Sequence, residues 1–172
     1  MKRFLKSWVR ETDGVTAVEF SMVGIPFILM TIGIIETALM FTAQSLLQES
    51  TFAAARLVRT GQVQQAAGDP EQMFRDAVCD FSALLIPCER IQFQVKTVPN
   101  FEAADDEPPT FDEDGNLEDT TFDPGTENSV VLIRVAYNYP VVTPLMQAIY
   151  ANTAGNRRTL LSTIILQTEP YQ

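Results

Sequence analysis

The hydrophobic pattern of the chain is dominated by one apolar run that begins at Val15 and continues to about Phe41. About 20 apolar residues in a helix, at a rise of 1.5 Å each, span the roughly 30 Å hydrocarbon core of a bilayer. Beyond Phe41, apolar side chains recur at helical spacing until Gly61 supplies a helix-stop signal. The pattern predicts one helix over about 15–60, transmembrane over 15–41 and continuing as the spine of an exported domain.

Pro26 and Glu36 interrupt the apolar run, as does the acid Glu19 considered below. Pro26 lacks a backbone donor and crowds the preceding turn, so we expect a kink or a locally melted helix near residues 24–26. Glu36 lies about 32 Å along the helix from Val15, which predicts an interfacial residue at the outer membrane edge.

The pattern after Gly61 predicts a second helix. Asp69 is a suitable N-cap and Pro70 suits the first turn. An apolar face then repeats at helical spacing from Met73 to Leu85, and Pro87 ends the helix.

The C-terminal half of the chain has the pattern of strands. Apolar and polar residues alternate over 91–96, which predicts a half-exposed strand. Residues 129–139 predict a more buried strand, 144–151 a short helix, and 158–168 a third strand. We therefore expect an α+β fold over 62–172, in which an antiparallel sheet of about three strands packs on the spine helix and the second helix.

An acidic segment, 101–128, separates the first two predicted strands. A charge run of this kind is usually a solvated loop. The alternative is a calcium loop, because Asp112, Asp114 and Asn116 follow the spacing of the first ligands of an EF-hand. Against it, Leu117 stands where that loop requires glycine, and Asp123 replaces the bidentate glutamate.

Cys79 and Cys88 are the two cysteines of the chain. In an exported domain an even pair at short spacing predicts a disulfide. A metal site is not expected from two thiols in a chain without histidine.

The charges are distributed unevenly along the chain. Residues 1–14 hold four basic and two acidic residues, so the remaining 8 basic and 20 acidic residues leave a net charge of −12. A basic leader before an apolar run predicts a cytoplasmic N-terminus and an exported, periplasmic body. An acidic body also argues against a nucleic-acid partner, because phosphate contacts need clustered Lys and Arg.

The sequence offers no catalytic constellation. Without histidine there is no Ser–His or Cys–His pair, and no phosphate-binding glycine loop is present. We expect an interaction protein without a cofactor rather than an enzyme.

The leader admits three interpretations. A cleavable secretory signal would need a shorter apolar core and a cleavage site near Ala55, far beyond the end of this run. A plain signal anchor accounts for the length but not for Gly14 or for Glu19, an acid inside the apolar run.

The third interpretation accounts for both residues, because the leader resembles a type IV prepilin-like signal. In such signals a dedicated membrane peptidase cuts after the glycine, which here is Gly14 and would leave Val15 as the new N-terminus. Glu19 would then lie about 6 Å from the new amine along the helix, close enough for the two charges to pair within a chain or between neighbours. The simpler view is that Glu19 reaches the head groups as an interfacial residue.

Particular residues of this segment narrow the resemblance to one family. Gly14, Glu19, Phe20 and Pro26 match the pattern of the TadE-like pseudopilins, minor components of Tad (Flp) pili. The resemblance covers residues 10–61 and is looser at 137–145 and 169–171. The sister TadF-like group shares the leader pattern.

The resemblance implies a membrane-anchored minor pilin that helps to initiate or cap a Tad pilus used in adhesion. It implies as partners the membrane lipid, a prepilin peptidase, pilin subunits, TadF-like pseudopilins and the Tad inner-membrane platform. The alternative from the residues alone is a bitopic periplasmic binding or adhesin module that carries a plain signal anchor.

Overall fold

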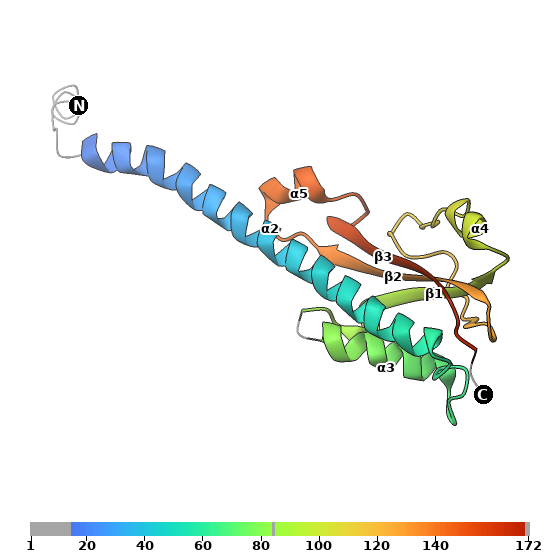
Figure 1. The fold of residues 1–172 in the computed structure, drawn as a ribbon. Helices are drawn as coiled ribbons and strands as arrows, with labels where there is room; N and C mark the ends of the chain where they lie inside the picture. Colours follow the sequence, from blue (N-terminus) through green and yellow to red (C-terminus); the bar gives the residue numbers. More distant parts are fainter. Residues whose placement is uncertain (1–14, 84, 171–172) are drawn as a thin grey trace, which may run out of the picture.

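The computed structural model describes residues 15–83 and 85–170, and its dominant feature is one long helix (Figure 1). Helix α2 runs from Val15 to Arg59, 45 residues in all. It ends one residue before the predicted end. Gly61 takes the left-handed conformation (φ 77°), and its N–H donates to the carbonyl of Val58, so the glycine predicted as a stop signal closes the helix.

The expected locally melted turn at Pro26 is not present. The α-helix continues without a break through Gly24 and Pro26. A proline inside a helix removes one hydrogen bond of the ladder, and the remaining helical bonds hold the turn together here.

Helix α3, Pro70–Ser82, starts as predicted. The Asp69 side chain accepts a hydrogen bond from the backbone N–H of Glu71 at 3.0 Å, and Pro70 occupies the first turn. The predicted apolar face, however, extended to Leu85, and that part is wrong. The helix ends at Ser82, Leu85 is 38% exposed, and Ile86 enters the core instead.

Three antiparallel strands form the sheet in the order β1-β2-β3. They are β1 (Ile91–Val98), β2 (Val130–Pro140) and β3 (Arg157–Gln167), which matches the three predicted strands to within one residue or two at each end. Short helices α4 (Phe101–Asp105) and α5 (Pro144–Tyr150) lie in the β1–β2 and β2–β3 connections, and a 3₁₀ turn (Cys88–Arg90) precedes β1. The described residues therefore have the predicted α+β fold.

One face of the sheet packs on the second half of α2 and on α3 (Figure 1). The core contains alternate residues of the strands, such as Phe93 and Ile133, together with Leu47 and Val58 from α2 and Phe74 from α3. Phe74 is fully buried, and its ring centroid lies 5.2 Å from that of Phe93. The hydrophobic stripe of α2 past residue 40 thus lies against the sheet, as expected for a spine helix.

Most acidic side chains of the segment 101–128 are exposed, as expected of a solvated loop, but part of the segment packs on the sheet. Its Leu117 is 6% exposed, and Ala104 of α4 is buried against the outer face of the sheet. Near its end, the carbonyl of Thr121 accepts a hydrogen bond from the N–H of Val95, which covers the otherwise free edge of β1.

Strand β1 is correspondingly more buried than the alternation predicted. Gln94 was expected to face solvent but is 3% exposed. Its amide donates to the Asp119 carboxylate at 2.5 Å, and the Gln92 amide donates to Asn116 at 2.6 Å. The polar side chains on this face of β1 therefore bind the acidic segment and are not there to face water.

Candidate functional site

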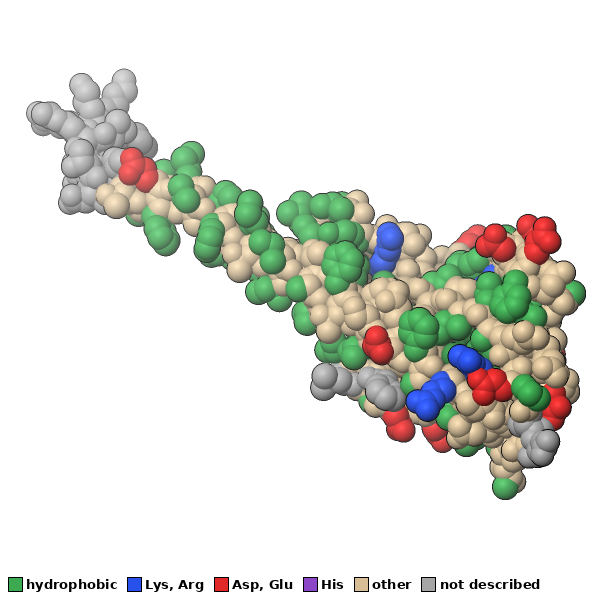
Figure 2. Space-filling model, in the orientation of Figure 1, with side chains coloured by type: hydrophobic (Ala, Val, Ile, Leu, Met, Phe, Trp, Pro, Cys, Tyr) green, Lys and Arg blue, Asp and Glu red, His purple; other side chains and the backbone are tan. Residues whose placement is uncertain are grey.

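The first half of α2 projects from the domain and leaves its apolar side chains uncovered (Figures 1 and 2). Phe20 is 77% exposed, Val23 72% and Phe27 68%. Of the most apolar 18-residue window in this helix, 6% is buried. Water does not favour so large an apolar surface on one helix, so the segment has the length and composition of a membrane anchor.

The predicted processing and charge-pairing residues lie at the far end of this segment. Gly14 lies outside the described residues, and Val15 is the first residue of α2. Glu19 and Phe20 are exposed on the first turns of the helix. Cleavage after Gly14 and pairing of Glu19 with a new amine stay predictions.

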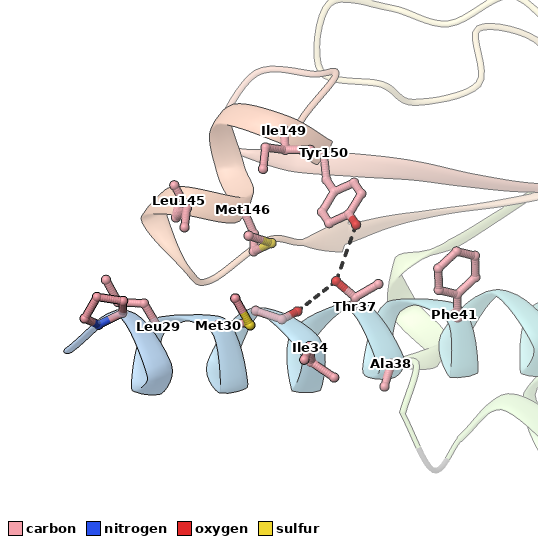
Figure 3. A pocket seen from close by; sticks show the side chains of 12 residues that line it. Leu29, Met30, Ile34, Thr37, Ala38, Phe41, Leu145, Met146, Ile149 and Tyr150 are labelled. Carbon is pink, nitrogen blue, oxygen red and sulfur yellow. Dashed lines mark hydrogen bonds between the residues drawn. The ribbon is translucent and has the colours of Figure 1, made fainter. Parts of the chain in front are cut away.

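An apolar groove of about 750 Å³ lies where α5 approaches α2 (Figure 3). Its walls come from Pro26 to Phe41 on one side and from Leu145 to Tyr150 on the other. The approach is close at Gly33, where a Cβ would stand 3.2 Å from the terminal methyl of Met146. The α+β domain is therefore in contact with the second half of the predicted transmembrane segment.

Glu36 fixes this approach through contacts that the sequence did not predict. It is 7% exposed, and its carboxylate accepts hydrogen bonds from the N–H groups of Val142 and Thr143, the latter at 3.0 and 3.1 Å. Thr143 is the N-cap of α5 but makes no capping bond with its own side chain. The acid of α2 therefore supplies the acceptor that the start of α5 lacks.

The sequence contains both halves of this contact, but neither half identifies the other. An acid in an apolar run is costly unless donors satisfy it, and Thr143-Pro144 is a typical helix start. Nothing in the order of residues indicates that these two features, more than 100 positions apart, meet in the fold.

Comparison with known proteins decides what the projecting helix is. The family model described as TadE-like protein matches residues 14–56. This segment is TadE-like. The match begins at the predicted cleavage glycine and ends three residues before the end of α2, so the resemblance drawn from Gly14, Glu19, Phe20 and Pro26 is confirmed.

A TadE-like segment implies a protein associated with the Tad pilus machinery. The match covers most of the long helix and none of the sheet, so it gives no information on the α+β domain, which is interpreted from its own residues. No curated protein and no solved structure matches the chain.

Behind the TadE-like segment, the predicted disulfide joins Cys79 of α3 to Cys88 of the following turn, with the two Cα atoms 5.6 Å apart. It ties the end of α3 to the start of β1. Both thiols are consumed in the bond, and they carry no separate chemistry.

The calcium alternative gains no support from the acidic segment. The Asp112 carboxylate accepts hydrogen bonds from the N–H groups of Asp114 and Asn116 and from the Asn116 side-chain amide, so it closes its own turn. The bond from the Asn116 side chain is the largest of the effects that lower the pKa of Asp112. Over residues 15–83 and 85–170, no group of three or more His, Cys, Asp or Glu side chains is placed to hold a metal ion.

Beneath the acidic segment lies a buried arginine that the sequence did not single out. Arg134 is 4% exposed, and its guanidinium donates to the Gln94 side chain and to the Glu107 carbonyl. Burial lowers the pKa of Arg134, and the nearby Glu107 and Asp119 carboxylates partly oppose that effect. The cluster fastens the acidic segment to the sheet.

Proposed function

We propose that the chain is a membrane-anchored pseudopilin, or minor pilin, that takes part in the initiation or the tip of a Tad (Flp) pilus and so in surface attachment. The proposal rests on one observation, which is that the family match and the exposed apolar surface lie on the same helix. The TadE-like match falls on helix α2, whose first half is apolar and exposed. A surface of this kind can be covered by lipid before assembly and by neighbouring helices in a filament.

The proposal assigns a role to each residue at the start of the helix. Peptidase cleavage after Gly14 exposes the amine of Val15, and Glu19 of the same chain or of a neighbouring pilin neutralises it. The leader stays in the cytoplasm, the helix crosses the inner membrane once, and the domain faces the periplasm.

The role is structural and needs no catalysis. The absence of histidine from the sequence and the use of both cysteines in a disulfide support this part of the proposal. The expected partners are the peptidase, the pilin, TadF-like pseudopilins and the inner-membrane platform.

The mature N-terminus tests processing. Mass spectrometry of the chain from cells that contain the cognate peptidase should give a mature chain that starts at Val15, and a Gly14→Ala variant should keep its leader. A full-length chain in the presence of active peptidase would contradict the proposal and favour a plain signal anchor.

A second experiment tests assembly. Glu19→Ala should abolish pilus assembly while leaving the protein in the membrane, because the anchor keeps its apolar length. Glu49→Ala is the matched control, since Glu49 is an exposed acid on the same helix, close to the sheet. Normal assembly with Glu19→Ala would favour a tethered binding or adhesin module.

A further inference from the structure

The segment around α5 is unusually apolar for a surface of this protein. From Pro140 to Asn156 there is no charged residue, although charged residues make up 20% of the chain. Val142 is 76% exposed and Ile149 62%, so the segment presents apolar side chains outward as well as toward the groove. The charge returns immediately afterwards with the exposed pair Arg157 and Arg158.

The position of α5 along α2 indicates where this apolar surface lies relative to a membrane. Gly33 and Thr37, which face α5, follow Val15 by 18 and 22 residues and so lie about 27 and 33 Å along the helix. The hydrocarbon core of a bilayer is about 30 Å thick. If the start of α2 lies at the cytoplasmic face, α5 lies at the outer boundary of the membrane.

Two contacts hold α5 at this level. The Glu36 carboxylate accepts the N–H groups at its start, and near its end the hydroxyls of Thr37 and Tyr150 lie 3.4 Å apart (Figure 3). A tyrosine at this depth is in the layer where aromatic side chains gather in membrane proteins. The depth of α5 is therefore set by α2.

We propose that α5 is an interfacial helix that enters the outer leaflet, and that lipid acyl chains fill the groove between it and α2. Leu145 and Ile149 enter the acyl boundary, and Arg157 and Arg158 meet lipid phosphates just above it. The groove is continuous with the lipid-facing surface of the anchor, which is why lipid is its occupant. The proposal depends on α2 spanning a membrane and not on any role in a pilus.

The orientation of the domain follows from this contact. Most acidic side chains visible in Figure 2 lie on the part of the domain away from the projecting helix. With α5 in the leaflet, the acidic segment points away from the membrane, which also keeps it away from anionic lipid. The exported domain thus stands on the membrane at a fixed angle rather than on a free tether.

A single-tryptophan reporter tests the contact in the full chain. Trp8 is the chain's one tryptophan, so Trp8→Phe gives a silent background into which Ile149→Trp is introduced. Phe101→Trp on α4 is the control, because Phe101 is also about half exposed (51%), and α4 lies at the other end of the domain from α5 (Figure 1). Both variants are reconstituted at low protein density in phosphatidylcholine–phosphatidylglycerol vesicles whose acyl chains are brominated.

Brominated acyl chains should quench the tryptophan at 149 by about half or more, with a blue-shifted emission, and the tryptophan at 101 by little. Equal, weak quenching at both sites would overturn the proposal. A blue-shifted but unquenched signal at 149 would also overturn it and would assign the groove to a second protein chain.

A second reporter, Leu145→Trp, keeps the test independent of any one substitution. It should give the same strong quenching, because residues 145 and 149 both line the groove and are both exposed. Strong quenching at 145 but none at 149 would mean that the groove is open to lipid while α5 does not enter the leaflet, and would contradict the proposal. Since these vesicles contain no pilus components, none of the outcomes depends on the proposed assembly role.

Discussion

Replacing Glu36 by alanine should release α5 from α2 while leaving the rest of the domain folded. The carboxylate accepts two backbone N–H groups in a site where it is 7% exposed. Hydrogen bonds to a charged group contribute about 1.5 to 3 kcal/mol each, and a buried N–H without a partner costs about 1 to 3 kcal/mol. Two such bonds would sum to about 3 to 6 kcal/mol if shielded from water. Because Val142 is 76% exposed, a loss of about 2 to 4 kcal/mol at this contact is expected.

The loss should be local because α5 contributes no buried residue to the core. Such a helix opens without global unfolding, and its amides exchange through the local opening. A change of about 2 to 4 kcal/mol corresponds to roughly 30- to 1000-fold in the opening equilibrium, up to the point at which the segment is already open. The exchange of amides in 144–151 should therefore accelerate by at least about tenfold.

Hydrogen-exchange mass spectrometry of the full chain in detergent micelles measures this effect peptide by peptide. Glu36→Gln should have an intermediate effect, since it keeps an acceptor oxygen but loses the charge. Glu49→Ala, an exposed acid on the same helix, should leave the exchange of α5 unchanged. Unchanged exchange of α5 in Glu36→Ala would refute the reasoning, and so would equal acceleration in α3 and β2.

Further predictions concern the domain behind the anchor. Replacing both cysteines by alanine should lower the free energy of unfolding by about 2 to 3 kcal/mol, because the disulfide closes a short loop, and an unchanged urea midpoint would contradict this. Phe74→Ala should cost about 3 to 5 kcal/mol in the same assay, since the ring is fully buried, whereas Phe52→Ala, on a side chain 59% exposed, should cost far less. The pKa of Asp112 is lowered first of all by the hydrogen bond from the Asn116 side chain, so the folded turn favours the ionised acid. Its contribution should be complete above about pH 5 and lost as the pH falls through the folded-state pKa, which amide exchange in this turn at pH 3 and pH 6 can detect. Calorimetric titration with calcium should give no heat, and a saturable signal that disappears in Asp112→Asn would revive the calcium loop.

Local signals in the sequence were sufficient for most of the elements, but not for helix α4 or for the end of α3. Gly61 ends a helix because glycine adopts the left-handed conformation at little cost, and Asp69-Pro70 starts one because the side chain caps and the ring fits the first turn. The alternating and β-branched runs predicted the strands, and the short cysteine spacing, with export expected, predicted the disulfide. Each of these depends on neighbours within about ten positions.

The anchor could be recognised for the same reason. Its length, its single early acid and the residues around Gly14 are contiguous, and the family match falls on that same stretch. The packing of the acidic segment on the sheet was not predicted, because burial of a polar residue depends on what packs above it. Gln94 and Arg134 are covered by a segment whose path the sequence does not give.

What the sequence alone determined is therefore the membrane-anchoring helix, the order of the elements and the fold class. Only the tertiary structure decided that Glu36 of the anchor accepts the N–H groups of Val142 and Thr143, which sets the depth of α5 beside it. The physical reason is that a long apolar run favours an apolar environment such as a membrane, whichever residues lie beside it. A buried charge is acceptable only when particular donors meet it, and that meeting is a property of the folded chain.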